Sequence, residues 1–460
     1  MLKLYNALDK TVSEFVPLKS GEVKMYSCGP TVYSYPQIGN MRAYIFMDSL
    51  RRVLKFNGYK IIGVMNITDV GHLVSDDDFG EDKMAKAALK EKKLPQEIAD
   101  YYTEAFMNDL QSLNISLPEH ITKATEYVNQ IIEFIKILEQ KRYTYQIDDG
   151  VYFDIKKYGK YGKLSPKDLN KPGLARIEEN PNKHHPYDFA LWKFVDPNHI
   201  MKWDSPWGVG CPGWHIECSA MAKDILGDKF DIHTGGVDHL TVHHESEIAQ
   251  NDAAAGHQVV TRWMHNEFLL ADGGKLSKSL GNSYTLNELE AKGYSPMDFK
   301  YFCQNTHYRK QLNFTFEAMD GAKAARLNLK KLLLEHKNAT ENKADEKVLN
   351  DYHKQFVDAV NDDLNLPLAL GVLWQLVKLP RAQSIYKKAL EFDQVFGLKL
   401  DEEEIVKSQE IPAEITKLAE MRLTVRAQKN WAESDRLRDE IIGLGYSIKD
   451  TKDGYKITKE

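Results

Sequence analysis

The chain has 460 residues, of which 42% are hydrophobic and 28% are charged, a composition typical of globular proteins with substantial cores. This length predicts two to four domains. The net charge of −6 excludes a chain that attracts nucleic acid over its whole surface, so any RNA contact must come from local patches.

Compartment and redox state follow from what the sequence lacks. It has no run of about 18 apolar residues, and its first 19 residues carry charges throughout. We therefore expect no membrane helix and no signal peptide, and we expect a cytoplasmic location. The four cysteines, at 28, 211, 218 and 303, include no C-x-x-C pair, which argues against a zinc ribbon. A reducing compartment argues against disulfides.

The N-terminal part alternates strand and helix patterns. Residues 23–28 read as a strand, residues 41–56 have apolar side chains at helical spacing before Asn57-Gly58, and residues 60–67 read as a buried strand. This order predicts a parallel α/β unit.

The middle of the chain changes character and then returns to the α/β pattern. Two helical stretches are expected within 82–113, followed by a helix at 122–141 and aromatic, strand-like residues at 151–155. A helix at 213–226 and a strand at 230–234 resume the first pattern. We therefore predict an insertion between two halves of one sheet domain.

The C-terminal part is expected to be nearly all helical from residue 316 onward. Its end, residues 444–457, has Gly445 and Asp453-Gly454 between short strand-like pieces, which predicts a hairpin.

Two glycine-containing segments have the character of phosphate sites. Residues 30–42 lie between the first strand and the first long helix, where unpaired N–H groups and the helix dipole favour an anion, and Gly39 allows close approach. Residues 272–282 bring together Lys275 and Lys278 beside a pair of glycines. Taken alone, the first segment is more typical of an ordinary strand-to-helix turn with a packing glycine, and the second is equally typical of a solvated surface loop.

A metal site is predicted from the histidine-rich region. Ten of the fifteen histidines fall between His184 and His265. His243 and Glu247 are four residues apart and share a helix face, and Cys28 and Cys218 complete a set of two sulfurs, one nitrogen and one oxygen that zinc accepts. His244 or Cys211 could replace a member, and solvated histidines are the alternative interpretation.

Taken together, these segments resemble the cysteinyl-tRNA synthetases nearly end to end. The resemblance rests on six blocks in a specific order: YSCGPTVY at 26–33, NITD at 66–69, KWDSPWG at 202–208, PGWHIECSAM at 212–221, KLSKS at 275–279 and KNWAESDRLR at 429–438.

The resemblance implies an α/β class I fold, with a Rossmann-like parallel-sheet catalytic domain followed by a helical bundle and a small α+β C-terminal domain. The implied parts are catalytic halves at 1–118 and 203–260, a connective insertion at 119–202, a stem-contact region at 261–315, a tRNA-binding bundle at 316–404 and an anticodon-recognition domain at 405–460.

The resemblance also assigns residues. It places catalysis on Gln37, Asn40, Lys275 and Lys278, and the zinc ligands on Cys28, Cys218, His243 and Glu247. The substrate and ATP pocket falls on Thr31, Gly39, Thr68, Trp214, Asp238 and Lys278. Two positions depart from the family: Gln37 stands where it has histidine, so activity is expected at a reduced rate, and Cys211 stands where it more often has arginine.

The implied reaction activates L-cysteine with Mg²⁺-bound ATP and transfers it to tRNA(Cys). Serine is nearly isosteric with cysteine, and pocket shape supplies only about 1–3 kcal/mol between such analogues, whereas ~10⁴-fold accuracy needs about 5.5 kcal/mol. One Zn²⁺ per chain that binds the substrate thiolate would close this gap, because a hydroxyl is a poorer ligand.

Near the C-terminus, Trp431 and Arg436 are candidate contacts for unpaired anticodon bases, the alternative being a charged helix with Trp431 in its core. Two other functions compete: a ligase that transfers cysteine to an amino sugar, and a non-catalytic tRNA-binding paralogue, which Gln37 suggests. A monomer without membrane contact is the family-level expectation.

Overall fold

The computed structural model describes residues 1–70, 87, 91, 93–165, 180–196, 199–271, 273–276, 281–340, 343–402, 412–451 and 454–459. It divides the chain into two compact units, Met1–Asp401 and Glu402–Glu460. Within the described ranges, no helix is both long enough and apolar enough to cross a membrane.

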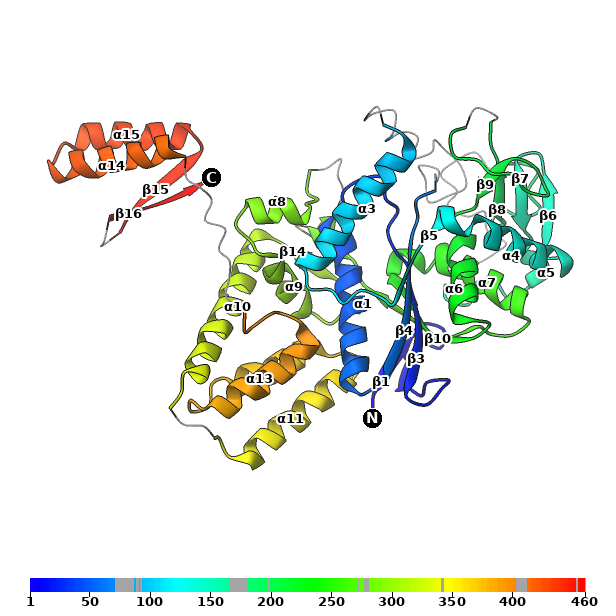
Figure 1. Ribbon diagram of the computed structural model, residues 1–460, viewed down its shortest axis with the longest axis horizontal. Coiled ribbons are helices and arrows are strands. Elements are labelled where there is room, and N and C mark those ends of the chain that lie inside the picture. The colour runs from blue at the N-terminus through cyan, green and yellow to red at the C-terminus, as the bar shows by residue number, and fades with distance from the viewer. Residues whose placement is uncertain are drawn as a thin grey trace. The chain divides into compact units, whose positions relative to one another are not determined.

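A five-stranded parallel sheet lies at the centre of the first unit, which confirms the predicted α/β class (Figure 1). Its strands, in spatial order, are β11 (Val260–Asn266), β10 (Phe230–Gly236), β3 (Glu22–Ser27), β4 (Lys60–Ile67) and β5 (His120–Lys123). Each neighbouring pair is parallel. The carboxyl ends of all five strands therefore meet at one edge.

Helix α1 (Ile38–Phe56) connects β3 to β4, as the strand–helix–strand pattern predicts. Leu50, Val53 and Leu54 on this helix are fully buried. The helix starts three residues earlier than the apolar spacing indicates, because Gln37 and Asn40 form its N-terminal cap. Asn57 is its C-terminal cap, and Gly58 takes the left-handed conformation with φ 83°.

A four-stranded antiparallel sheet forms a second layer within the first unit. It consists of β6 (Thr144–Ile147), β7 (Gly150–Phe153), β8 (Phe189–Phe194) and β9 (Gly210–Pro212). Helices α4 (Val128–Gln140), α6 (Ile216–Leu226) and α7 (His243–Ala255) share a hydrophobic core with it. The inserted layer therefore packs directly on helices of the catalytic half.

The structure corrects two expectations about this region. The helix predicted at 122–141 starts only at Val128, because residues 120–123 form β5 and residues 124–127 form a 3-10 turn, η1 (Ala124–Tyr127). Strand β5 lies within the predicted insertion, residues 119–202, but belongs to the parallel sheet. Strand β9 lies outside that range but belongs to the antiparallel sheet. The predicted insertion therefore does not coincide with the antiparallel sheet.

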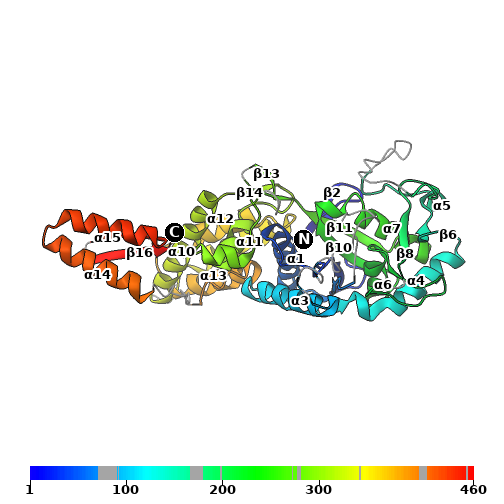
Figure 2. The same ribbon diagram turned by 90° about the horizontal axis from the view of Figure 1, so that it is seen from above.

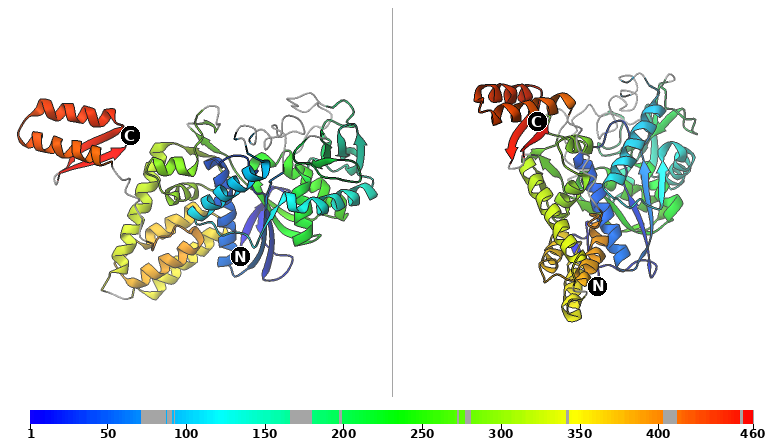
Figure 3. Two further views of the ribbon diagram at one scale, coloured as in Figure 1. Left: turned by 45° about the horizontal axis from the view of Figure 1, so that its top comes forward. Right: turned by 60° about the vertical axis from the view of Figure 1, so that its left-hand side comes forward.

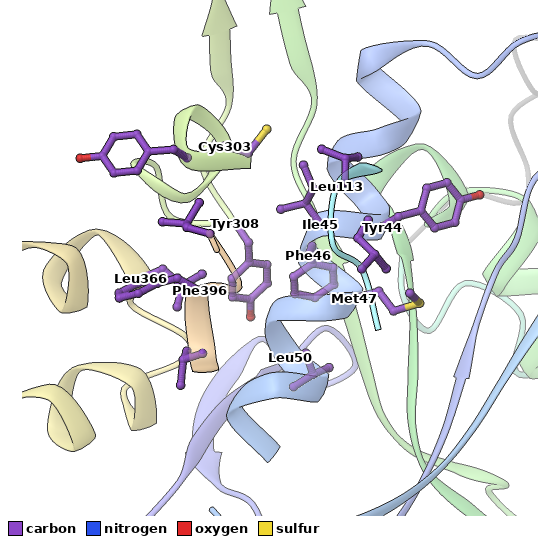
Figure 4. Packing of buried hydrophobic residues seen from close by; sticks show 14 of the residues in the cluster. Tyr44, Ile45, Phe46, Met47, Leu50, Leu113, Cys303, Tyr308, Leu366 and Phe396 are labelled. Atoms are coloured by element: carbon purple, nitrogen blue, oxygen red, sulfur yellow. The ribbon is translucent and has the colours of Figure 1, made fainter. Parts of the chain in front are cut away.

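Of the remaining helices longer than one turn in the first unit, α3 (Pro95–Ser112) runs alongside α1, and the others lie on the other side of α1 from the antiparallel sheet (Figure 2). The others are α8 (Leu286–Ala291), α9 (Pro296–Gln304), α10 (Phe316–Lys337), α11 (Glu346–Asn361), α12 (Leu366–Leu376) and α13 (Gln383–Phe396); α3 comes from the helical stretches expected within 82–113. The stack of Phe46 and Tyr308, with ring centroids 4.5 Å apart, joins α1 to the segment that follows α9 (Figure 4).

Short strands complete the first unit. A hairpin of β1 (Lys3–Asn6) and β2 (Thr11–Glu14) leads the chain, and a three-stranded sheet contains β13 (Gly274–Lys275), β12 (Leu269–Ala271) and β14 (Leu312–Phe314). α5 (Ile155–Tyr158) is a single turn, and η2 (Val237–His239) is a 3-10 turn after β10.

The second unit has its own small core. Helices α14 (Ala413–Ala427) and α15 (Trp431–Gly443) pack against a hairpin of β15 (Tyr446–Thr451) and β16 (Gly454–Lys459), visible in red tones in Figure 3. Ile415, Ala419, Ile441 and Ile448 form the core. The predicted C-terminal hairpin is confirmed.

Candidate functional site

A pocket of about 540 Å³ opens at the carboxyl ends of β3, β4, β10 and β11. Parallel sheets bind ligands at this edge, because the connecting loops there are free to carry polar groups. Ten residues predicted from sequence line it: Cys28, Thr31, Gln37, Gly39, Asn40, Thr68, Trp214, Cys218, Asp238 and His243. The fold thus brings together residues that are spread over more than two hundred positions of sequence.

A cluster of metal-ligating side chains lies at one end of this pocket. Cys28 follows β3, Cys218 lies on α6, and His243 and Glu247 face the same way one turn apart on α7. His243 Nε2 is 3.0 Å from Glu247 Oε1 and 3.6 Å from Cys218 Sγ, and Cys28 Sγ is 3.7 Å from Glu247 Oε1. The four ligand atoms all lie within 4.8 Å of one another, close enough to surround a single ion.

A second group of four residues overlaps the first. It keeps Cys28 and Glu247 but uses His233 and His244, again with all ligand atoms within 4.8 Å of one another. His244 Nε2 lies 3.2 Å from Cys28 Sγ, so His244 stays an alternative ligand by geometry. Cys211 lies on β9 and belongs to neither group among the described residues, so the structure does not favour it as a replacement.

Three histidines near the cluster are not part of the sequence prediction. His215 Nδ1 is 2.9 Å from His243 Nδ1, His233 Nε2 is 2.9 Å from Glu247 Oε2, and His265 Nε2 is 2.7 Å from His244 Nδ1. The one signal that could have found them is the density of histidines between 184 and 265. Their contacts orient the groups that face the pocket.

Burial dominates the electrostatics of the cluster. Burial raises the pKa of the Glu247 carboxyl and of the Cys28 thiol, and it lowers the pKa of His233 and of His244. It also lowers the pKa of His265, to about 3. A hydrogen bond with Cys28 lowers the pKa of the Cys218 thiol. Neutral imidazoles and a readily ionised thiol are the forms that coordinate metals, and a bound cation would favour ionisation of Cys28 and Glu247 as well. The donor set therefore fits a zinc-like ion.

Glycines allow the chain to pass closely around the cluster. A Cβ on Gly29 would come within 1.5 Å of the Asn66 carbonyl oxygen, and a Cβ on Gly235 within 2.6 Å of the His244 ring. Both positions exclude any larger residue, so the loop after β3 and the end of β10 can approach their neighbours closely.

The predicted amino-acid side of the pocket is held by buried polar contacts. The Thr68 hydroxyl donates to Glu217 Oε2 at 2.9 Å and accepts from Asn66 Nδ2 at 3.0 Å. The backbone of Thr31 pairs with that of Thr68. The Trp214 ring centroid is 4.6 Å from that of His243, and Asp238 lies in η2 at the same pocket.

The start of α1 contacts the second predicted phosphate segment, residues 272–282, and the residues that follow it. Gln37 Oε1 accepts from Ser283 Oγ at 2.6 Å, and the Ile38 N–H donates to the Tyr284 carbonyl at 2.8 Å. A Cβ on Gly39 would be 3.1 Å from Leu276. Asn40 Oδ1 accepts from the Gln37 N–H at 3.1 Å, which caps the helix. The two predicted phosphate segments are therefore neighbours in space.

Of the two lysines in the second predicted phosphate segment, the structure describes only one. Lys275 lies on β13, whose backbone pairs with β12. Lys278 lies outside the described residues.

In the second unit, Trp431 is 57% exposed, with the Arg426 guanidinium 5.6 Å from its ring centroid. This exposure argues against the alternative in which Trp431 fills the core. Arg436 forms ion pairs with Glu433 at 2.7 Å and Glu440 at 2.9 Å.

Comparisons with known proteins agree on one family. Residues 14–324 match the family described as tRNA synthetases class I (C) catalytic domain. A cysteine–tRNA ligase of Treponema denticola is 42% identical and covers 98% of both chains, and one of Borrelia garinii is 40% identical over 100% of both. A Burkholderia lata relative, cysteine–tRNA ligase 1, is 43% identical over 99% of this chain and 96% of its own.

The solved structures support the fold more broadly. A methionyl-tRNA synthetase of Mycobacterium tuberculosis, bound by methionyl-adenylate, has a TM-score of 0.58 at 15% identity and covers 82% of this chain and 92% of its own. At this identity the likeness shows the fold alone.

Proposed function

The chain belongs to the cysteine–tRNA ligases, a family of class I aminoacyl-tRNA synthetases, and we propose that a zinc ion that selects cysteine is held by Cys28, Cys218, His243 and Glu247. The observation that carries the proposal is the convergence of these four side chains within 4.8 Å at the end of the pocket. Zinc bound there would supply a site that a thiolate ligates well and a hydroxyl poorly.

The proposed reaction has two steps. A carboxylate oxygen of cysteine attacks the α-phosphorus of Mg²⁺-bound ATP, and the bond to the bridging oxygen breaks, releasing diphosphate. The 2′-hydroxyl of the terminal adenosine of tRNA(Cys) then attacks the carbonyl carbon of the adenylate, releasing AMP. The protein contributes mainly orientation and charge stabilisation.

Residues of the chain divide these tasks in the proposal. Gln37, Gly39 and Asn40 approach the nucleotide at the start of α1, where the helix dipole favours phosphate. Thr31, Thr68, Trp214 and Asp238 surround the amino acid. Lys275 and Lys278 neutralise charge that develops on the phosphates during transfer.

The tRNA part of the proposal rests on the second unit. Exposed Trp431 offers a ring for stacking on an unpaired base, and Arg436 offers a cation once it leaves its two glutamates. We expect the enzyme to act in the cytoplasm as a monomer.

One pair of assays tests the activity. Diphosphate exchange that depends on cysteine separates an enzyme from a binding protein, and charging of tRNA(Cys) separates a synthetase from a ligase that uses an amino sugar. The near-complete coverage of cysteine–tRNA ligases favours the synthetase over this amino-sugar alternative.

The zinc proposal has its own measurement. X-ray absorption at the zinc edge is expected to show one additional sulfur neighbour when cysteine is added and no change when serine is added. A protein purified without stoichiometric zinc, or a zinc spectrum that cysteine leaves unchanged, would contradict the proposed selection by the metal.

A further inference from the structure

Helix α7 carries a buried acidic residue that the reaction leaves unused. His243 and Glu247 are one turn apart and face the metal cluster. Glu245 lies midway between them in sequence, so it projects from the opposite side of the helix. It is 0% exposed. A buried carboxylate at this position must find hydrogen-bond donors outside the cluster.

Four consecutive backbone N–H groups of the inserted segment supply these donors. Glu245 Oε1 accepts from Gly162 N at 2.8 Å and Lys163 N at 2.7 Å, and Oε2 accepts from Leu164 N at 2.8 Å and Ser165 N at 3.3 Å. Gly162 has φ 99°, a conformation that favours glycine. An ionised carboxylate accepts about four hydrogen bonds, so this cradle satisfies it completely.

Side-chain contacts extend the same attachment along the helix. The Tyr161 and Ser246 hydroxyls are 3.1 Å apart, and Lys163 Nζ lies 2.6 Å from Asp252 Oδ2. Residues 161–165 therefore hold both the first turn of α7 and a point nearly two turns further on. The helix is fixed between the metal cluster on one face and this segment on the other.

We infer that Glu245 is a positioning residue for the metal centre, through which residues 162–165 of the insertion set metal affinity and the selection of cysteine. The inference rests on the proposed zinc site. Its physical basis is that two of the four ligands come from this one turn, so a small rotation or shift of α7 moves both donor atoms together. Contacts behind the ligands of a metal typically change its affinity by about 10–100-fold.

Glu245→Gln is the direct test. The glutamine keeps the length of the side chain but turns one acceptor oxygen into a donor that faces two N–H groups. We expect zinc retention, measured by competition with a chelator, to weaken about 10–100-fold. We also expect the KM for cysteine in diphosphate exchange to rise while the KM for ATP stays unchanged, and discrimination against serine to fall.

Asp188→Asn is the matched control. Asp188 is a buried carboxylate of the same insertion that accepts from Ile155 N at 3.0 Å, His185 N at 2.9 Å and the Tyr145 hydroxyl at 2.7 Å. These three partners all belong to the insertion, and none of them lies on α7. A general loss of folding would lower zinc retention and activity alike in both variants, whereas positioning predicts that the KM for cysteine changes only in Glu245→Gln.

Gly162→Ala tests the same contact from the other side and covers the case in which Glu245→Gln does not fold. Alanine is strained at φ 99°, so it displaces the cradle without altering α7. The same losses of zinc and cysteine affinity support the inference. If the folded variants keep the zinc affinity and the cysteine KM of the wild type, the inference about Glu245 is overturned. If the unsubstituted protein itself binds no zinc, the proposed zinc site is overturned instead.

Discussion

Gln37 is a neutral residue at the start of α1, within the first predicted phosphate segment. The resemblance implies a histidine at this position in the family, and a neutral amide carries no positive charge toward a phosphate. In the structure its Oε1 accepts from Ser283 Oγ at 2.6 Å, and its Nε2 donates to the Tyr35 carbonyl at 3.3 Å. The side chain thus joins the start of α1 to Ser283, directly after the second predicted phosphate segment, residues 272–282.

Gln37→Ala is expected to raise the KM for ATP in cysteine-dependent diphosphate exchange by about 2–10-fold, the equivalent of one neutral hydrogen bond. Ser283→Ala removes the partner and is expected to have a similar effect. The double variant should be little worse than either single variant, because both remove the same contact. Fully additive effects, measured by the same exchange assay, would mean that the two side chains act independently.

The ligand set illustrates what a sequence can predict at this scale. Cys28, Cys218, His243 and Glu247 are candidate ligands by their chemistry, and the last two share a helix face because they are four residues apart. The fold brings all four together. His233 and His265 are not identifiable in this way. They approach the cluster only because β10 and β11 pair in a register that sets His233 opposite Trp263 and Gly235 opposite His265. Because these parallel strands are joined by a helix, the residues that lie opposite each other are far apart in sequence, and the local pattern of either strand does not reveal them.

At the scale of elements, α1 is predicted well and β5 is not. Apolar residues at helical spacing define α1 over most of its length, and its first turn is extended by a cap that the spacing does not reveal. Strand β5 has only four residues, and it exists because it pairs with β4 from Val64 to Ile67. A short strand of this kind depends on its neighbour, so its own sequence resembled the start of the following helix.

A cluster of buried charged side chains joins α1 to α9 and to the residues that follow α3. The local sequence does not predict these contacts. Asp48 is 0% exposed and accepts from Lys300 Nζ on α9 at 2.7 Å, from Arg52 Nε at 2.7 Å and from Ser116 N at 2.9 Å. Lys300 also donates to the carbonyls of Leu113 and Asn114 at 3.0 and 3.1 Å. Leu113, one of these partners, also belongs to the apolar cluster around α1 shown in Figure 4.

Asp48→Asn is expected to lower the free energy of unfolding by about 3–5 kcal/mol at neutral pH, because it leaves the Lys300 ammonium buried without a counter-charge. Urea unfolding followed by circular dichroism measures the change. Glu433→Gln, which alters an exposed ion pair, is the control and should change stability little. A loss below about 1 kcal/mol in Asp48→Asn would show that solvent reaches this cluster of charged side chains.

The pH dependence of this difference has a definite sign. Burial alone raises the pKa of Asp48, but Lys300 and Arg52 outweigh it and hold the pKa below its ordinary value. The stability that the carboxylate contributes is therefore present above the unfolded pKa of about 3.9 and is lost as pH falls through the lower folded value. The gap between wild type and Asp48→Asn should narrow as pH falls below about 4. A gap that widens there would contradict the assigned direction.

At the scale of the whole molecule, the two units have separate hydrophobic cores. Within the described part of the chain, the clusters of the first unit end at Leu400, and the cluster of the second unit contains only residues after 412. The pocket and the metal cluster are built entirely from the first unit, whereas Trp431 and Arg436 belong to the second. The division favours separate roles in activation of cysteine and in recognition of tRNA.

A chain that ends at Asp401 is therefore expected to fold and to keep cysteine-dependent diphosphate exchange within about 2-fold of the full chain. Charging of tRNA(Cys) should fall by more than 10-fold in kcat/KM, since a single base stacked on an aromatic ring contributes about 1–3 kcal/mol. Trp431→Ala in the full chain should reproduce part of the charging defect, while Trp431→Phe, which keeps a ring, should largely restore charging. An equal loss of exchange and charging in the truncated chain would instead place the second unit in support of the catalytic fold, because removal of a unit that only reads tRNA cannot slow a step in which tRNA takes no part.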